Sequence, residues 1–264
     1  MRVADHGPVA GWGSVRTVSL LTGAIVLFGL FAVVESRAKA PLIPLRVFRV
    51  RALVGGNLMT LLVAMSTYGG ALIMSIYAQE VLGYSAVVFG LSTAIYSAMS
   101  IVGSNLAGLL TTRFGYKKVA VLGAVLLSVG TLLLSRVPVD GAYWTDLLPG
   151  LVVFGAGIGT TVVASAIAAL SDVAPNESGL ASGINNSVFQ IGAAFGIAVC
   201  TTVSVAYTDP AAADARTGLN EGVQAAFGAV AVFAIICLVM AIALNMMRER
   251  TKKPGAEAHT SLHS

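Results

Sequence analysis

The chain has 264 residues, of which 56% are hydrophobic and only 11% are charged, and its mean hydropathy is +0.86. Soluble globular chains carry about 25% charged residues, so this composition excludes a soluble enzyme, a secreted disulfide scaffold and a disordered chain. The formal net charge of +4 does not indicate nucleic-acid binding, because the basic residues lie between the hydrophobic segments.

The predicted elements are seven long segments without Asp, Glu, Lys, Arg or His: 17–34, 52–79, 81–112, 119–135, 147–171, 178–208 and 222–247. A helix that spans a bilayer needs about 20 mostly apolar residues, with about 17 as the lower limit. None of the segments shows the period-two alternation of a membrane β-strand. We therefore predict an all-α membrane protein with seven transmembrane helices.

The segments group into four parts. Residues 1–36 form an N-terminus and one leading helix, and residues 37–51 form a linker with five basic residues. Residues 52–247 form six helices, and residues 248–264 form a polar tail. Six helices divide evenly into three plus three, which is the plan of inverted-repeat transporters.

The distribution of positive charge predicts the orientation. Twelve Lys and Arg residues lie on the side of the linker and the tail, and four lie on the opposite side. Because Lys and Arg are retained on the cytoplasmic side, we expect an inner-membrane protein with its N-terminus outside and its C-terminus in the cytoplasm. An external N-terminus without a cleaved signal leads us to expect the back part of a longer protein.

Groups able to carry chemistry are scarce. The three histidines lie in the terminal segments, and no acid occurs inside a hydrophobic segment. Intramembrane carboxylates are the usual proton relays of transporters, so the chain has no evident proton-coupling group of its own. We expect no enzyme, no metal site and no cofactor; a retinal protein is excluded because segment 222–247 has no lysine for a Schiff base.

Neutral polar residues recur at helical spacing on two segments. Segment 52–79 carries Asn57, Thr60, Tyr68, Ser75 and Gln79, and segment 178–208 carries Ser182, Asn186 and Gln190. These spacings keep one face of a helix. Two interpretations stay open and are compatible: hydrogen bonds between helices, and the polar wall of a substrate cavity.

Glycine pairs predict close helix contacts in segment 178–208. Gly179 and Gly183 form one GxxxG pair, and Gly192 and Gly196 form another. Small residues let helix backbones approach closely in a bilayer. The spacing fits static packing and sliding contact equally well.

The most specific motif is GLLTTRFGYKK, which connects segments 81–112 and 119–135 and contains Gly108, Arg113, Gly115, Lys117 and Lys118. Gly115 permits a tight turn, and the clustered positive charge suits a cytoplasmic pivot. This motif resembles the cytoplasmic signature of the major facilitator superfamily, in its second-half copy. Thr112 stands where the first-half copy usually has Asp, which weakens any charge-relay role.

Two further stretches are similar to the fourteen-spanner drug:proton antiporters of the EmrB/QacA type. They are the N-terminal stretch with its linker RAKAPLIPLRVFR and the run SDVAPNESGLASGINNSVFQIGAAFGIAV. The resemblance implies one extra helix followed by the six-helix C-terminal half of such a protein. It also implies that the proton-carrying acid belongs to an N-terminal half, joined covalently or separate.

By the same resemblance, helices 52–79 and 147–171 face a central cavity. The implied wall residues are Asn57, Thr60, Tyr68, Thr160 and Ser165, with Asn186 and Gln190 as second choices. The expected function is proton-coupled export of small apolar or cationic compounds by alternating access in the lipid bilayer. The alternative is a fragment that does not transport, or a helical interaction module.

Overall fold

The computed structural model describes residues 15–37, 51–212 and 214–249, and all regular structure within them is helical. The elements are α1 (Val15–Arg37), α2 (Arg51–Ile76), η2 (Tyr77–Val81), α3 (Ala86–Phe114), α4 (Tyr116–Leu134), η3 (Tyr143–Leu147), α5 (Leu148–Leu170), η4 (Pro175–Glu177), α6 (Ser178–Tyr207) and α7 (Ala215–Glu249). Residues 38–50 of the predicted linker and residues 250–264 of the predicted tail lie outside the described residues, while Arg37 ends α1 and Arg51 begins α2.

Six helical stretches in the described chain are long and apolar enough to cross a membrane, and they begin with Ala52–Val81 and end with Ala215–Met246. The predicted all-α membrane class is confirmed at this level. Within α1 the apolar stretch is Val18–Leu27, which is shorter. The seventh span therefore stays a prediction.

Helix α1 belongs to a unit of its own, and α2 to α7 form the second unit. The described side chains of α1 are exposed. Thr22 donates its hydroxyl to the carbonyl of Val18, 2.8 Å away, so the one threonine of this stretch is satisfied inside the helix.

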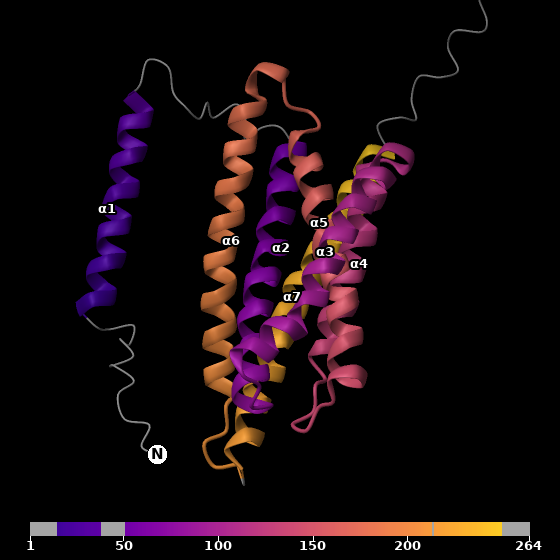
Figure 1. Cartoon of the computed structure of the whole chain (residues 1–264). Coiled ribbons are helices and arrows are strands. Elements are labelled where there is room, and N and C mark those ends of the chain that lie inside the picture. The colour runs from indigo at the N-terminus through magenta and orange to yellow at the C-terminus, as the bar shows by residue number, and fades with distance from the viewer. Residues whose placement is uncertain (1–14, 38–50, 213, 250–264) are drawn as a thin grey trace, which may run out of the picture. The chain divides into compact units, whose positions relative to one another are not determined.

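In the second unit the helices run alternately up and down, and α2 and α5 lie at the centre (Figure 1). Helix α5 packs against α3 and α4, while α2 packs against α6 and α7; α2 also contacts α5. Helix α3 is the least buried span and α5 the most buried. The apolar core is built around large buried side chains such as Tyr77, Phe154 and Phe227.

Two glycines with positive φ shape the turns around α3. Gly83 has φ +70° and precedes Ser85, whose side chain accepts the backbone N–H of Val88 and caps the helix. Gly115 has φ +82° and separates α3 from α4, so that one residue reverses the chain direction. A residue with a Cβ atom is strained in this region, which agrees with the turn that the sequence predicts at Gly115.

The helix contacts explain only one of the two predicted glycine pairs. A Cβ atom on Gly192 would lie 2.6 Å from the carbonyl oxygen of Leu61, and one on Gly196 would collide with the carbonyl of Met65. These two glycines are the point where α6 crosses α2. Gly179 and Gly183 have no neighbouring atoms within 4 Å of such a Cβ, so the expected close contact is wrong for that pair within the described chain.

Candidate functional site

A chain of hydrogen bonds, buried at Thr60 and Ser165 and half-buried at Asn185, joins α2, α5 and α6. The amide Nδ2 of Asn185 on α6 donates to Oδ1 of Asn57 at 3.0 Å and to Oγ1 of Thr60 at 2.9 Å. Thr60 donates to Oγ of Ser165 on α5 at 3.1 Å, and Ser165 donates to the carbonyl of Val162 at 3.0 Å. Each hydroxyl in the chain therefore has both a donor and an acceptor role, as buried polar groups require.

Next to this cluster lies a hollow of about 670 Å³ between the end of α5 and the beginning of α6. Its lining residues are Val162, Ala166, Ile167, Leu170, Ser171, Ser182, Asn185, Asn186 and Phe189. Small-molecule sites have volumes of about 300–1,000 Å³ and are mostly apolar with a few polar groups. No residue of this lining is charged. The hollow suits a small neutral or weakly polar ligand.

The structure brings three of the predicted wall residues together. Asn57, Thr60 and Ser165 all belong to the buried cluster, and each is less than one-tenth exposed. Thr160 lies elsewhere on α5, where its hydroxyl bonds the carbonyl of Ala156 at 2.8 Å and faces that of Gly103 at 3.4 Å. The hydroxyls of Thr60, Thr160 and Ser165 and the Oδ1 of Asn57 are bonded to protein groups, and the role of these four residues as a cavity wall stays a prediction.

The other predicted wall residues are more exposed. Asn186 lines the hollow, and Gln190 one turn further along α6 is exposed. Tyr68 is 40% exposed and meets Phe189 edge to face, with ring centroids 5.9 Å apart. This aromatic pair continues the lining of the hollow towards the middle of α2, because Phe189 belongs to both.

Asn185 is the residue that the sequence pattern missed. The stripe of Ser182, Asn186 and Gln190 predicts the polar face of α6, but those three side chains are exposed, while Asn185 faces α2. A signal existed: Asn185 lies seven residues before Gly192, and a separation of seven residues returns to the same face of a helix. The glycine that marks the α2 contact therefore also marks Asn185.

A second, smaller hollow of about 110 Å³ lies between α2 and α3, with α5 beneath it. Its residues are Gly70, Ala71, Met74, Phe89, Thr93, Tyr96, Ser97, Leu151 and Phe154. Tyr96 and Phe154 stack with their centroids 5.9 Å apart. Each of the two hollows thus has an aromatic pair that connects a central helix to the helix crossing it.

The basic turn between α3 and α4 connects to the last helix. Nζ of Lys117 donates to the carbonyl of Leu244 near the end of α7 at 2.9 Å. Arg113 is exposed, and its guanidinium lies 5.4 Å from the ring centre of Phe114. Lys118 is exposed, and Gly108 has open space beside it. The motif residues therefore form a turn that is tied to α7 by one lysine.

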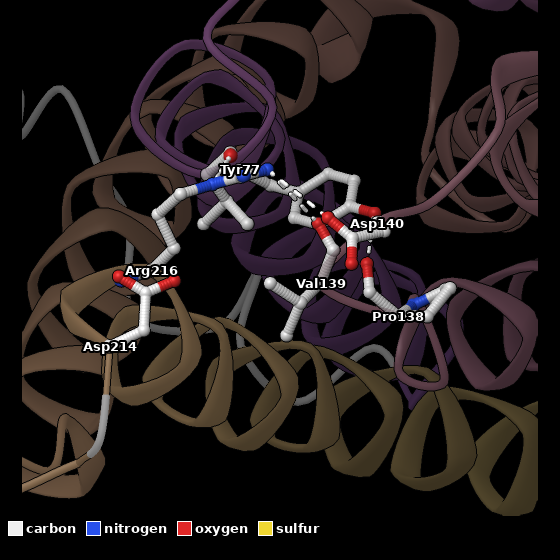
Figure 2. Close-up of polar contacts among 7 residues, drawn as sticks. Tyr77, Pro138, Val139, Asp140, Asp214 and Arg216 are labelled. Atoms are coloured by element: carbon white, nitrogen blue, oxygen red, sulfur yellow. Dashed lines mark hydrogen bonds and ion pairs between the residues drawn. The ribbon is translucent and has the colours of Figure 1, made fainter.

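A polar clamp closes the opposite end of the bundle (Figure 2). Nε of Arg216, at the start of α7, donates to the carbonyl of Val81 at 2.7 Å, and one of its terminal nitrogens lies 3.5 Å from the carbonyl of Val139. The same guanidinium forms an ion pair with Asp140 at 3.6 Å. The hydroxyl of Tyr77 donates to the carbonyl of Pro138 at 2.7 Å.

Two further side chains of α7 complete this clamp. Asn220 and Gln224 both donate to the carbonyl of Val137, at 3.2 and 2.8 Å. Three successive carbonyls of the α4–α5 connection, those of residues 137–139, are thus bound by side chains of η2 and α7. In the sequence, Arg216 contributes only one positive charge to a predicted loop. No sequence pattern predicts that side chains of η2 and α7 bind the carbonyls of residues 137–139.

Comparison with known proteins agrees with the helical membrane fold. The sequence matches the Major Facilitator Superfamily over residues 6–197 and again over residues 56–264. The chain belongs to the Major Facilitator Superfamily. This family consists of membrane transporters, so the resemblance carried by the GLLTTRFGYKK motif is confirmed at the level of the superfamily.

Several relatives in the superfamily are named for drug resistance or export. The chain is 32% identical over 192 residues to the tetracenomycin C resistance and export protein of Streptomyces glaucescens, covering 73% of this chain and 36% of that protein. It is 31% identical over 263 residues to the puromycin resistance protein pur8 of Streptomyces alboniger, covering 95% and 52%. A quinolone resistance protein, NorB of Staphylococcus aureus, is 28% identical over 234 residues, covering 88% and 50%.

The chain therefore spans about half the length, or less, of these superfamily relatives. Within the described residues, the chain itself contains six apolar spans, the hollow beside α5 and α6, and the basic turn.

Proposed function

We propose that this chain is the C-terminal half of an exporter of the EmrB/QacA type, which moves small apolar or cationic compounds outward while protons enter. It works by alternating access together with an N-terminal half of six or seven helices, covalently joined or separate. The observation that carries the proposal is the uncharged 670 Å³ hollow in a chain that belongs to a transporter superfamily.

The walls of the hollow support the substrate class. Amide and hydroxyl groups offer hydrogen bonds without demanding a charge, and Phe189 with Tyr68 offers aromatic faces. Aromatic faces attract apolar rings and cations alike. The relatives named for tetracenomycin C, puromycin and quinolones support a cargo of this kind.

The helix contacts support an inverted repeat of three plus three helices within residues 52–247. Helix α2 crosses α6 at Gly192, where a Cβ would press on Leu61, and α5 crosses α3 at Gly159, where a Cβ would press on Ser100. In a three-plus-three repeat, the symmetry rotation places α2 on α5 and α3 on α6. It therefore places the α2–α6 crossing on the α5–α3 crossing. The same rotation exchanges the two hollows, each of which lies between a central helix and the helix that follows it.

The arrangement of charge supports the proposed orientation and coupling. The basic turn and the beginning of α6 lie at the same end of the bundle, and we assign that end to the cytoplasm. Acids in the described spans, such as Glu80, Asp146 and Glu221, lie near span ends rather than at the hollow. We therefore assign the proton-carrying acid to the N-terminal half.

The test is a fused transporter in which residues 1–264 replace the part of pur8 with which they align. We expect the fused protein to restore growth of a sensitive bacterium in puromycin, and the chain alone to fail. Tyr68→Ala should lower resistance because it removes the ring beside Phe189, whereas Tyr68→Phe should preserve it. Arg113→Ala should lower resistance, with Arg113→Lys as the control that keeps the charge.

Resistance from the chain alone contradicts the half-transporter assignment. A fused protein that reaches the membrane at the level of pur8 and gives no resistance contradicts the export proposal. That second result favours the alternative of a membrane segment that does not transport.

A further inference from the structure

The small hollow between α2, α3 and α5 carries an additional inference. Its volume is about 110 Å³, and none of its lining residues is charged. Sites for drug-sized molecules have volumes of about 300–1,000 Å³, whereas an apolar cavity of about 150 Å³ is sufficient to bind benzene. The small hollow therefore matches a single ring rather than a whole drug-sized molecule.

The lining of the small hollow contains two stacked aromatic rings. Tyr96 on α3 and Phe154 on α5 have ring centroids 5.9 Å apart and an interplanar angle of 23°. Phe154 has room for this position because residue 70 is glycine, where a Cβ atom would lie 2.9 Å from the tip of the ring. Met74 adds a buried thioether to the same lining. Flat and polarisable side chains of this kind favour a flat aromatic ligand.

The hydroxyl of Tyr96 is free to bind a ligand. The hydroxyls of Tyr77 and Tyr143 donate to backbone carbonyls at 2.7 and 2.8 Å, but the half-buried Tyr96 has no hydrogen bond within the part of the chain that the structure describes. A tyrosine that is largely buried usually finds a partner for its hydroxyl. An acceptor atom on a bound ring, such as an ether oxygen, supplies that partner in the small hollow.

The exposed face of α2 leads from the large hollow to the small one. Tyr68 contacts Phe189 of the large hollow, and Ala71 lines the small hollow. Both Tyr68 and Ala71 are exposed, and residues three apart on a helix have Cβ atoms only about 5–6 Å apart. One molecule with two ring groups therefore reaches both hollows along this face.

We infer that the small hollow is a second cargo subsite, which binds one aromatic ring with a hydrogen-bond acceptor while the rest of the molecule occupies the large hollow. This inference rests on the proposed export function and narrows its substrate class to compounds with two separated ring groups. The ring lies against Tyr96 and Phe154, and the Tyr96 hydroxyl donates to the acceptor. A charged group of the cargo stays outside, because the small hollow has no charged partner for it.

The test measures how cargo protects a thiol in the small hollow, in membrane fragments that carry the fused transporter. Ser97→Cys places a thiol on the lining, and the two native cysteines of this chain are buried. The ligands are puromycin, which carries a methoxyphenyl ring, and puromycin aminonucleoside, which lacks it. Protection is the rate of labelling by N-ethylmaleimide without ligand divided by the rate with ligand, and the fused transporter without Ser97→Cys gives the background.

We expect puromycin at about ten times its dissociation constant to slow the labelling of Ser97→Cys roughly tenfold, because only an empty subsite reacts. The aminonucleoside, at the same multiple of its own dissociation constant, should slow it less than about twofold, because it fills only the large hollow. Ala98→Cys is the matched control, since Ala98 is exposed on the same helix but does not line the small hollow. Neither ligand should slow its labelling.

Two further variants, each combined with Ser97→Cys, test what the subsite recognises. Ala71→Leu fills the small hollow from α2 and should bring protection by puromycin close to one. Tyr96→Phe keeps the stacked ring and removes the hydroxyl, so protection should fall about twofold to threefold, as for one hydrogen bond in a membrane. Thr93→Leu fills the hollow from α3 and keeps the test decisive if Ala71→Leu fails to accumulate.

Equal protection of Ser97→Cys by the two ligands overturns the second subsite, and so does equal protection of Ala98→Cys by puromycin. Undiminished protection in the filled variants has the same meaning. The outcome is separate from that of the proposed function: a fused protein that gives puromycin resistance without protecting Ser97→Cys is an exporter without this subsite. A fused protein that protects Ser97→Cys but gives no resistance keeps the subsite and contradicts the export proposal.

Discussion

Two adjacent asparagines on α6 show how a shift of one position along a helix changes what a side chain contacts. Asn185 faces α2 and donates two hydrogen bonds, while Asn186 faces the hollow and is exposed. Neighbouring helix positions differ by about 100° around the axis. Of these two chemically identical amides, one therefore bonds to a neighbouring helix and the other lines the hollow without such a bond among the described residues.

The first prediction concerns the stability that Asn185 contributes. Asn185→Ala should lower the free energy of unfolding by about 1 kcal/mol, because two interhelical hydrogen bonds of roughly 0.6 kcal/mol each are lost. Asn186→Ala should leave it unchanged within the error of the measurement. Thermal unfolding of the purified chain in detergent compares the two variants, and equal destabilisation would contradict the assigned contacts.

The second prediction concerns the crossing of α2 and α6. Gly196→Ala should destabilise the chain by about 1–3 kcal/mol, since the added methyl group collides with the backbone of Met65. Gly183→Ala has open space and should be neutral or stabilising by up to about 1 kcal/mol, because alanine favours a helix over glycine. Unfolding in the same detergent measures both, and a harmless Gly196→Ala would show that the crossing is looser.

At the scale of whole elements, the sequence predicts helices well where charge marks their ends. Segment 147–171 corresponds to α5 at Leu148–Leu170, and segment 178–208 to α6 at Ser178–Tyr207. Segment 81–112 is less accurate, because α3 begins only at Ala86, after the positive-φ Gly83 and the capping Ser85. A segment defined only by its lack of charged residues does not reveal a turn made by glycine and serine.

Polar contacts between elements escape the local pattern altogether. Asn185 and Thr60 are 125 residues apart, and Gln224 and Val137 are 87 residues apart. The spacing of polar residues along one helix gives the candidate faces, but the choice between Asn185 and Asn186 depends on where α2 lies. The carbonyls bound by the clamp have no sequence signature, because every residue carries one.

The third prediction concerns the clamp between η2, the α4–α5 connection and α7. Arg216→Ala should release the carbonyls of Val81 and Val139, and it should destabilise this end by about 1–2 kcal/mol. Asp140→Ala should cost less than about 0.5 kcal/mol, since its ion pair is largely exposed. Hydrogen–deuterium exchange over residues 77–84 and 137–146 should rise in the first variant only.

The fourth prediction concerns the basic turn. Lys117→Ala removes the bond to the carbonyl of Leu244 and should increase hydrogen–deuterium exchange at the end of α7 and the start of α4. Lys118→Ala, which changes an exposed neighbour of the same charge, should leave exchange at both places unchanged. Equal exchange in the two variants would show that Lys117 does not hold the helices together.

At the scale of the whole molecule, the chain supplies six described spans, a central pair of helices and one large uncharged hollow. Composition and the basic motif are sufficient to predict the membrane class and the superfamily. The hollow and the hydrogen bonds of Asn185 beside it depend on contacts between helices distant in sequence, which composition does not contain. Since the chain spans about half the length of its relatives, transport is a property that we assign to the pair of halves.

The most direct test of this account is uptake of radiolabelled puromycin into inverted membrane vesicles that maintain a pH gradient, acidic inside. We predict uptake by the fused transporter, loss of uptake when a protonophore collapses the gradient, and no uptake by residues 1–264 alone. Equal uptake by the chain alone, or none by a fused protein inserted at the level of pur8, would contradict the central claim that this chain is the C-terminal half of a proton-driven exporter.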